Sequence, residues 1–320
     1  MSVLVTGGAG YIGSHVVRLL QQRGTGVVVV DDLSNGRPER VGDAPVVQLD
    51  LATDAAVPTL TAAIAEHGVE AVIHFAARKQ VGQSVAEPAR YWSQNVGGTA
   101  NLLLAMEAGK VDKLVFSSSA ATYGAPTTPL VREDGPAEPI NPYGQTKLVG
   151  EWMTRAAGRA WGLRAANLRY FNVAGAGWDD LGDTAVMNLI PIVFSALDAQ
   201  QAPAVFGDDY PTPDGSCVRD YVHVLDLAQA HLAALDHLAT DDRPHDTFNV
   251  GSGTGASVLE VLAEVRAVTG VDVEPVVHAR RAGDPPQLVA DVERITTTLG
   301  WRATKDLHDI VTSAWSAWRR

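Results

Sequence analysis

The sequence of 320 residues contains a single cysteine, Cys217. An intrachain disulfide is therefore excluded, and such cysteine usage suits a reducing compartment. The surroundings of Cys217 do not resemble those of a catalytic thiol, so we expect it to pack in the interior. The nine histidines are scattered and form no H-E-x-x-H pattern, so we expect no metal site.

Long apolar runs are also missing. Stretches such as Val27–Val30 are far shorter than the roughly 20 residues that a membrane-spanning helix needs. The first residues, Met1–Thr6, carry no basic segment and lead straight into a predicted strand, so we expect no signal peptide. These features predict a cytoplasmic protein that has no membrane partner.

Positive charge is scarce, with 25 Lys and Arg residues against 37 Asp and Glu residues and a formal net charge of −12. Because nucleic-acid binding depends on a basic surface that neutralises phosphates, a general nucleic-acid partner is excluded. A few arginines in one pocket would still be enough to bind a nucleotide. The content of hydrophobic residues, 46%, is ordinary for a globular protein with a large core.

The first 170 residues alternate short apolar runs with longer segments of helical periodicity. Such runs are typical of parallel strands that are covered on both faces. The predicted strands are Val3–Thr6, Val27–Val30, Val46–Leu49, Ala71–Ala76, Leu114–Ser118 and Ala165–Tyr170. Their alternation with helices predicts an α/β fold with a doubly wound parallel sheet of the Rossmann type.

After Asn172 the pattern changes to loop-rich stretches between shorter helical segments. Helices are predicted near Ala185–Asp198, Leu225–His237, Val258–Thr269 and Leu307–Trp318. We expect a smaller α/β lobe that is interwoven with the first domain. The expected division is residues 1–171 plus about 222–252 in one domain, and about 172–221 plus 253–320 in the other.

A glycine-rich turn, Gly7–Gly13, follows the first predicted strand and opens a predicted helix. Glycines at these positions let backbone N–H groups approach a pyrophosphate and let the helix start close to the sheet. The second strand leads to Asp31, near the expected interval for an acid that binds the adenosine ribose. Because a carboxylate there would repel a 2′-phosphate, the pattern predicts NAD rather than NADP as the cofactor.

The spacing of Gly7, Gly10 and Gly13 resembles the extended branch of the short-chain dehydrogenase/reductase superfamily. This resemblance implies a Tyr-x-x-x-Lys pair at mid-chain, and Tyr143 and Lys147 form one, directly after an Asn-Pro pair that suits a helix start. The spacing of four places both side chains on one helix face. A free phenol titrates near pH 10, and a cation within about 4–6 Å typically lowers a pKa by about one to three units. Lys147 and the positive nicotinamide would therefore activate Tyr143 as a base.

Three serines, Ser117–Ser119, end the fifth predicted strand, at the edge of an open α/β sheet where ligands bind. We interpret Ser117 and Ser118 as structural residues. Ser119 aligns with the active serine of the superfamily, and this resemblance implies that it supports Tyr143 in catalysis.

The resemblance narrows to the UDP-glucose 4-epimerases and extends over most of the chain. The matching runs include Val3–Gly8, Tyr11–His15, Val72–Ala77, Phe116–Ala120, Pro142–Gly144, Leu168–Asn172, Asp209–Thr212, Val218–Tyr221, and Arg280-Arg281 with Gly283-Asp284. The resemblance implies an NAD-binding role for the first domain and a UDP-sugar-binding role for the second. It also implies an isomerase that inverts a UDP-hexose at C4 through a transient 4-keto sugar.

The resemblance further implies the roles of individual residues. The implied catalytic residues are Tyr143, Lys147 and Ser119. The implied cofactor-binding residues are Gly7, Gly10, Tyr11, Ile12, Gly13, Asp31, Asn35, Asp50, Leu51, Phe75, Ala76, Lys79, Asn95, Tyr143, Lys147 and Tyr170. The implied substrate-binding residues are Asn172, Asn188, Leu189, Phe206, Arg219, Arg281, Asp284 and Leu288. Related 4,6-dehydratases carry an acidic pair where this chain has Ala120 and Ala121, so dehydration is disfavoured.

Three questions stay open at this stage. In the family, the residue aligned with Leu288 guards the hexose pocket, and a leucine leaves open whether N-acetylated sugars are accepted or whether Leu288 simply packs. A UDP-uronate or UDP-pentose 4-epimerase and a non-catalytic NAD-binding sensor are the alternatives, although the intact Ser119, Tyr143 and Lys147 argue against the sensor. The resemblance implies a homodimer that forms through helices near residues 96–108 and 143–158.

Overall fold

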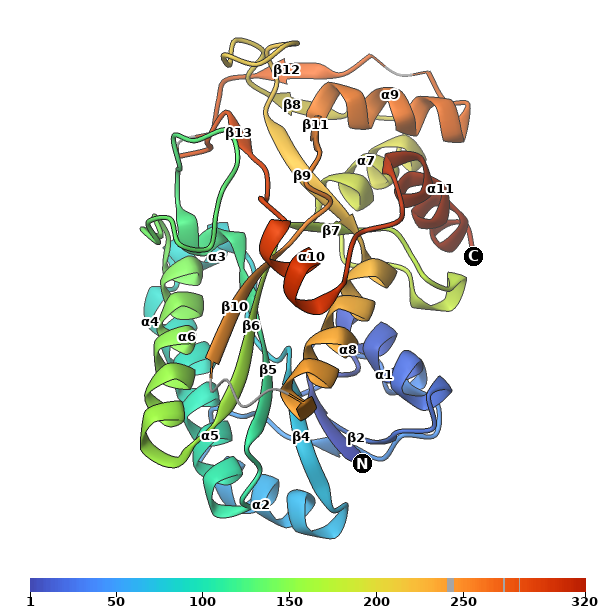
Figure 1. The fold of residues 1–320 in the computed structure, drawn as a ribbon. Helices are drawn as coiled ribbons and strands as arrows, with labels where there is room; N and C mark the ends of the chain where they lie inside the picture. Colours follow the sequence, from blue (N-terminus) through green and yellow to red (C-terminus); the bar gives the residue numbers. More distant parts are fainter. Residues whose placement is uncertain (241–244, 273, 282) are drawn as a thin grey trace. The chain divides into compact units, whose positions relative to one another are not determined.

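The computed structural model describes residues 1–240, 245–272, 274–281 and 283–320 (Figure 1). The chain divides into two compact units. The first consists of Met1–Gly124, Ala137–Arg169 and Ala228–Phe248, and the second of Ala125–Pro136, Tyr170–Leu227 and Asn249–Arg320. The predicted domain ranges also contain positions 241–244, 273 and 282, which lie outside the described residues.

A seven-stranded sheet forms the centre of the first unit, in the order β10-β6-β5-β4-β1-β2-β3. The strands are β1 (Ser2–Thr6), β2 (Gly26–Asp31), β3 (Val46–Gln48), β4 (Val69–His74), β5 (Lys113–Ser119), β6 (Arg164–Tyr170) and β10 (His245–Val250). The pairs β1–β2, β2–β3, β1–β4 and β4–β5 are all parallel. This order confirms the predicted Rossmann-type fold, and its direction reverses between β1 and β4, where ligands of such sheets bind.

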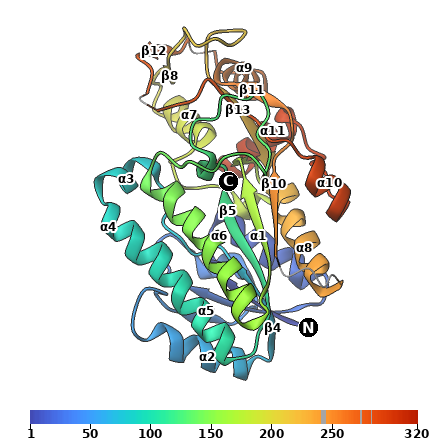
Figure 2. The same ribbon diagram turned by 60° about the vertical axis from the view of Figure 1, so that its left-hand side comes forward.

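Helices cover both faces of this sheet. They are α1 (Tyr11–Gln22), η1 (Pro38–Val41), α2 (Ala56–Glu66), α3 (Val81–Ala86), α4 (Pro88–Tyr91), η2 (Trp92–Gly97), α5 (Gly98–Ala108), η3 (Ala120–Tyr123), α6 (Pro142–Trp161) and α8 (Val224–Thr240). Figures 1 and 2 show α2, α5 and α6 along one face and α1 and α8 along the other. Because both faces are covered, the middle strands are buried almost throughout, and residues such as Leu4, Val72 and Leu114 are fully enclosed.

The second unit has smaller sheets and its own apolar core. Its elements are β7 (Asn172–Ala174), η4 (Asp179–Leu181), α7 (Leu189–Asp198), β8 (Ala204–Phe206), β9 (Val218–His223), β11 (Gly255–Ser257), α9 (Val258–Thr269), β12 (Val276–His278), β13 (Gln287–Leu288), α10 (Glu293–Leu299) and α11 (Leu307–Trp318). Strand β9 pairs with β7, β11 and β13, while β8 pairs with β12. The core joins α7, α9 and α11 around residues such as Phe194, Val265 and Ile310.

Two helices of the second unit begin where local chemistry dictates. Ser257 and Glu260 form a capping box at the start of α9, and Asp306 and Asp309 form one at the start of α11. The helix predicted from Ala185 begins only at Leu189, because Asn188 is extended and acts as the N-cap. The predicted strand Ala71–Ala76 likewise ends earlier, at His74, so the two residues that follow lie beyond the sheet.

The compact units differ from the predicted domain ranges at residues 125–136, 170–171, 222–227 and 249–252. Residues 125–136 belong to the second unit because the backbone of Val131 bonds to Val289 and to Asp291, each over 2.9 Å. Residues 222–227 also belong there, since the Asp226 carboxylate accepts bonds from Thr304 and Lys305. Residues 249–252 belong to the second unit as well, because the Asn249 side chain donates to the carbonyls of Val131 and Asp291.

The single cysteine lies where its surroundings in the sequence predict. Cys217 is buried, with 6% of its surface exposed, as expected for a packed thiol. Within the described residues, none of the helices combines the length and the apolar character that crossing a bilayer demands. The same residues contain no group of three or more side chains suited to hold a metal ion.

Candidate active site

The turn between β1 and α1 is built so that only glycines fit. Gly7 has a φ of +69°, and a Cβ on it would lie 2.7 Å from the backbone nitrogen of Ala76. A Cβ on Gly13 would lie 2.3 Å from the carbonyl oxygen of Gly7. Gly10 is the N-cap of α1, and neither a side-chain cap nor an acidic residue occupies this helix start. The turn therefore leaves the positive end of α1 available for an anion, which suits the NAD pyrophosphate.

Asp31 lies at the carboxyl end of β2, close to the glycine turn. Its carboxylate is 6% exposed and accepts bonds from the backbone N–H groups of Ala9 at 3.0 Å and Leu33 at 2.9 Å. Burial raises the pKa of Asp31, while the two backbone bonds oppose this rise. Each carboxylate oxygen has capacity for a further bond, so the group is equipped to accept from ribose hydroxyls.

Several other predicted cofactor residues surround this edge of the sheet. Phe75 and Ala76 follow β4, and the Phe75 N–H donates to the carbonyl of Thr6 at 2.9 Å. The Asp50 carboxylate accepts from the Ala52 N–H at 2.9 Å and from the Gln94 side chain at 3.2 Å. Leu51 is buried, whereas Asn35 and Lys79 are exposed. Tyr11 and Ile12 form the first turn of α1.

Asn95 lies in a π-helical turn, η2, that the sequence pattern did not reveal. Its side chain exchanges two hydrogen bonds with the backbone of Arg78, at 2.8 Å and 3.0 Å, and donates to the Thr146 hydroxyl at 3.0 Å. Thr146 directly precedes Lys147. Such π-helical turns are frequent at functional sites, and this one connects the segment after β4 to the helix that carries the tyrosine.

Helix α6 brings the tyrosine and the lysine to the end of β5. Asn141 caps the helix by accepting from the Gly144 N–H at 2.9 Å, and Pro142 occupies its first turn, as expected. Tyr143 and Lys147 are 8% and 4% exposed, and the Tyr143 hydroxyl is hydrogen-bonded to Ser119. The Lys147 ammonium lies 6.0 Å from the centroid of the Tyr143 ring. The structure therefore brings all three predicted catalytic side chains together.

Burial dominates the protonation chemistry of these side chains. Burial raises the pKa of Tyr143, and the bond from Ser119 only partly offsets this effect. Burial also lowers the pKa of Lys147 to about 8. The lysine by itself thus does not lower the pKa of Tyr143 below its ordinary value, because the cost of burying a phenolate exceeds the contributions that favour it.

In the second unit, Arg219, Asp284 and Leu288 meet at the β9–β13 pair. Arg219 and Leu288 are register partners in this parallel pair. The Arg219 guanidinium donates from Nη1 to the carbonyls of Val218 and Pro285, both at 2.9 Å, and its Nη2 lies 3.6 Å from the Asp284 carboxylate. Arg219 is thereby held in place, which suits an arginine that binds phosphate oxygens.

The other predicted substrate residues form separate groups in this unit. The Arg281 guanidinium stacks 3.8 Å from the centroid of the Phe206 ring at the end of β8. Asn188 caps α7, next to Leu189, and its amide donates to Asp183 at 2.8 Å. Asn172 is hydrogen-bonded to Tyr221, its register partner on β9. Tyr170, a predicted cofactor residue, lies at the end of β6.

Two buried carboxylates, one in each unit, have no role in the sequence-based interpretation. Asp220 is fully buried on β9 and accepts bonds from the backbone N–H groups of Ser252, Gly253 and Ala290. Its position within the conspicuous Arg-Asp-Tyr run was the available signal. Glu151 is 1% exposed on α6 and pairs with Arg169 on β6. Glu151 comes four residues after Lys147 and so shares its helix face, but nothing else in the sequence pointed to a role for it.

Comparison with known proteins assigns the chain to a family. Residues 3–251 match the model of the NAD dependent epimerase/dehydratase family. The chain belongs to this family. It is 46% identical over 325 residues to a UDP-glucose 4-epimerase of Azospirillum brasilense, with 99% of this chain and 92% of the relative covered. It is 44% identical to that of Halalkalibacterium halodurans, with 99% and 95% covered.

Solved structures agree with this assignment. A UDP-glucose 4-epimerase from Stenotrophomonas maltophila, with bound NAD and formylated UDP-arabinopyranose, is similar with a TM-score of 0.94 and 42% identity over 100% of this chain and 98% of that one. The UDP-Glc/GlcNAc 4-epimerase of Campylobacter jejuni is similar with a TM-score of 0.87 and 38% identity over 99% of both chains.

These similarities confirm the predicted resemblance to UDP-glucose 4-epimerases, the NAD cofactor and the isomerase class. The same similarities favour neither a UDP-uronate or UDP-pentose 4-epimerase nor a non-catalytic sensor. The glycine turn and Asp31 fit NAD on structural grounds as well, because α1 begins without a side-chain cap or an acidic residue and the Asp31 carboxylate is bonded to the turn at Ala9.

Proposed function

We propose that the chain interconverts UDP-glucose and UDP-galactose by inverting the hexose at C4. The observation that carries this proposal is the buried Tyr143 phenol, which is hydrogen-bonded to Ser119 one helical turn before a buried lysine. Bound NAD would supply the hydride acceptor for C4 and, after the sugar has turned, the hydride donor for its opposite face. Because the cofactor is regenerated in every cycle, no second substrate is needed.

Tyr143 moves the proton in this mechanism. As a phenolate it removes the proton of the 4-hydroxyl while C4 is oxidised to a ketone, and as a phenol it returns the proton when C4 is reduced. The Ser119 hydroxyl donates to the Tyr143 oxygen and favours the charged form of Tyr143. Between the two halves, the 4-keto sugar turns over about its phosphate link.

Lys147 supplies fixed positive charge beside this proton carrier. Its Nζ donates to the Ser117 carbonyl at 2.8 Å, which holds the ammonium on the sheet side of α6. At 6.0 Å from the Tyr143 ring, the charge favours the phenolate. Together with the positive nicotinamide of bound NAD, it would offset the effect of burial on the pKa of Tyr143.

The second unit would hold the UDP portion of the substrate. Arg219 and Arg281 are the cations proposed for the diphosphate, since a planar guanidinium binds phosphate oxygens bidentately. Asn172, Asn188, Leu189, Phe206 and Asp284 are proposed to line the rest of this site. The ordered contacts of Arg219 support its role, because a side chain held in advance loses less entropy on binding.

The identity of the sugar depends on Leu288. It lies in β13 beside Arg219 and is partly buried, which is compatible with a position at the hexose pocket. A similar protein at 38% identity acts on both UDP-Glc and UDP-GlcNAc. We propose that a leucine at this position admits N-acetylated hexoses, and that Leu288→Tyr restricts the enzyme to UDP-glucose and UDP-galactose.

The enzyme is further proposed to be a cytoplasmic homodimer. The single cysteine supports the reducing location. Exposed apolar side chains on neighbouring helices of the first unit support the dimer: Trp92 is 37% exposed, Leu104 is 54% exposed and Trp152 is 55% exposed. They lie on η2, α5 and α6, at or near the segments expected for the interface.

The decisive experiment is a coupled assay of purified protein with UDP-galactose, in which formation of UDP-glucose is followed. Parallel assays with UDP-GalNAc, on the wild type and on Leu288→Tyr, test the sugar preference. Turnover without added NAD, together with NAD released on denaturation, is the expected result. Bound NAD without any turnover would contradict the proposal and indicate a sensor.

A further inference from the structure

Three successive serines at the end of strand β5 form hydrogen bonds with helix α6. The three helix residues involved are four positions apart and therefore share one face. Each is bound by a different serine: Tyr143 by the Ser119 hydroxyl, Lys147 by the Ser117 carbonyl and Glu151 by the Ser118 hydroxyl. The first two helix residues belong to the proposed catalytic group, but the function proposed above makes no use of the third.

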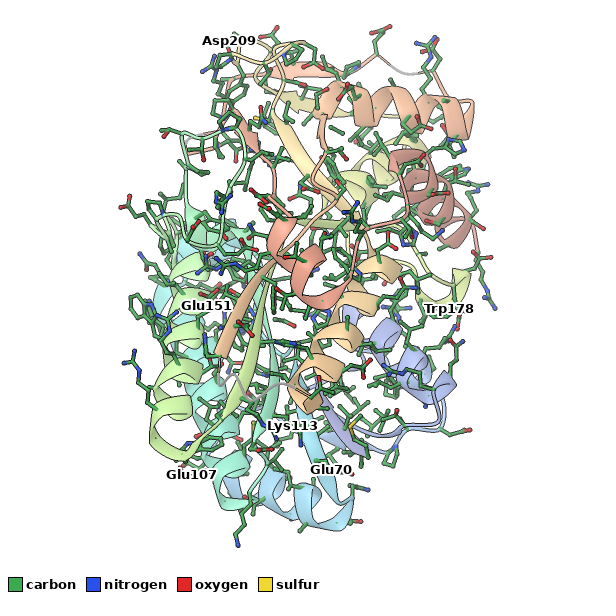
Figure 3. The ribbon with its side chains drawn as sticks, in the orientation of Figure 1. Glu70, Glu107, Lys113, Glu151, Trp178 and Asp209 are labelled. Atoms are coloured by element: carbon green, nitrogen blue, oxygen red, sulfur yellow. The ribbon has the colours of Figure 1, made fainter. Side chains whose placement is uncertain are left out.

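The Glu151 carboxylate accepts three side-chain hydrogen bonds, from Ser118 and Arg169. The Ser118 hydroxyl donates to its Oε1 at 2.5 Å. Arg169 donates to it through two nitrogens, from Nε to Oε1 at 2.8 Å and from Nη2 to Oε2 at 2.6 Å. Glu151 is 1% exposed and Arg169 is 6% exposed. Figure 3 labels Glu151 on α6, and Arg169 lies on β6, the strand next to β5.

Burying this ion pair has a cost that packing alone does not explain. Burial works against the charge of Arg169, yet the hydrogen bond and the charge of Glu151 raise its pKa. A buried ion pair is often no more stabilising than apolar residues of the same volume, and its best-supported benefit is to select one arrangement. We therefore expect this ion pair to fix a relative position of helix and strand that apolar packing alone would leave undefined.

The contact between α6 and β5 is of that kind. A Cβ on Gly150 would lie 2.3 Å from the Phe116 ring, and one on Gly144 would lie 2.4 Å from the carbonyl oxygen of Ala121. These glycines let the helix approach closely, but they present no side chain that interlocks with the strand. Directional hydrogen bonds from this helix face to β5 add to that packing and help to set the position of the helix along its axis.

We propose that Glu151, held by Arg169, is a positioning residue that fixes α6 along its axis through Ser118 and so sets the contact between the Tyr143 and Ser119 hydroxyls. This inference rests on the proposed roles of Tyr143 and Ser119. It assigns Glu151 a geometric task. The Glu151 charge is balanced by the Arg169 guanidinium, to which both of its carboxylate oxygens are bonded.

The test compares two carboxylates that each pair with an arginine of β6. Asp112 binds Arg164, at the start of that strand, at 2.7 Å in a half-exposed ion pair. We expect Glu151→Gln to lower kcat for UDP-galactose by about 10- to 100-fold with little change in KM, since small displacements of reacting groups have effects of this size. Asp112→Asn, the matched control, should leave both parameters unchanged.

The pH profile separates positioning from a loss of folded protein. If the Tyr143–Ser119 bond loosens, the pKa of Tyr143 rises further, because this bond lowers it. A base with a higher pKa is deprotonated only at higher pH, so the rise of kcat with pH should move to higher pH in Glu151→Gln. A variant that is merely less folded would show the same profile scaled down, and that result would overturn the proposal.

A double-mutant cycle tests the route through Ser118. We expect Ser118→Ala to lower kcat as well, and the double variant to be no worse than Glu151→Gln alone, since residues in one hydrogen-bond network are not additive. Additive effects would contradict the route. If Glu151→Gln does not fold, the pH profile of Ser118→Ala decides in the same way. A wild type without epimerase activity would refute the proposed function itself, whereas an active Glu151→Gln with an unshifted profile refutes only the positioning role.

Discussion

Lys147 donates from its Nζ to the main-chain carbonyl of Ser117 over 2.8 Å. The ammonium is thereby held by the strand, in a site that is 4% exposed, independently of the tyrosine four residues earlier. The contact fixes the position of the charge but does not compensate the whole cost of burial, because the pKa of Lys147 is still lowered to about 8. This residue is thus placed for function at some cost to stability.

Replacing Lys147 should reveal this cost. Unfolded lysine keeps its proton up to about pH 10.4, whereas the folded residue releases it from about pH 8. Between these values the unfolded state binds more protons, so stability rises with pH in this window. Lys147→Met should abolish activity, remove that rise, and leave the Tm at pH 7 unchanged or up to about 2–4 °C higher. Thermal unfolding between pH 7 and 10 measures it, with Lys110→Met, an exposed lysine, as control.

Tyr143→Phe should lower kcat by about 10²–10⁴, the usual contribution of a positioned acid–base group. NAD binding should persist, because the ring remains in place. Tyr210→Phe is the matched control: Tyr210 is also buried, but it belongs to the second unit. Near-normal epimerisation by Tyr143→Phe in the UDP-galactose assay would show that another group moves the proton.

Ser119→Ala should shift the pH dependence of the reaction. The Ser119 bond lowers the pKa of Tyr143 against the effect of burial, so its loss raises that pKa further. The rise of kcat should then begin at higher pH, with activity partly recovered in alkaline buffer. Ser84→Ala, which removes a buried hydroxyl bonded to the Val81 carbonyl, should show an unshifted profile. An unchanged profile in Ser119→Ala would mean that the serine does not act on the tyrosine.

Gly13→Ala should impair NAD binding and stability together. The added Cβ would lie 2.3 Å from the Gly7 carbonyl oxygen and 2.8 Å from the Gly8 Cα, so the turn or the helix must move. Overpacking of this kind costs about 1–3 kcal/mol. NAD released from the purified protein and its Tm measure both effects. Gly82→Ala is the control, because a Cβ there meets nothing within 4 Å; normal NAD content in Gly13→Ala would contradict the assigned pyrophosphate site.

A charged residue on the exposed apolar helices should separate the proposed dimer. Trp152→Glu places a carboxylate where a 55% exposed tryptophan now stands on α6, and burying it at an interface would be costly. Sedimentation velocity should show dimers for the wild type and monomers for the variant. Val277→Glu, at a 48% exposed position of the second unit, should stay dimeric. A monomeric wild type at micromolar concentration would refute the homodimer.

The sequence by itself determined the fold class and most of the first unit. Strand β1 and its glycine turn were predictable because buried parallel strands are short and apolar, and because a turn of this shape excludes side chains. Tyr143 and Lys147 were identifiable because a helix brings residues four apart onto one face. In each case the signal lies within a few residues of chain, where local geometry decides.

The tertiary structure decided what depends on residues far apart in the chain. Residues 125–136 belong to the second unit because Val131 pairs with Ala290, a contact that no local pattern contains. In the π-helical turn, the Asn95 side chain is bonded to Arg78 and to Thr146, which are 17 and 51 positions away in the chain. The Glu151–Arg169 pair and the raised pKa of Tyr143 arise from burial, and burial is a property of the packed molecule rather than of any segment.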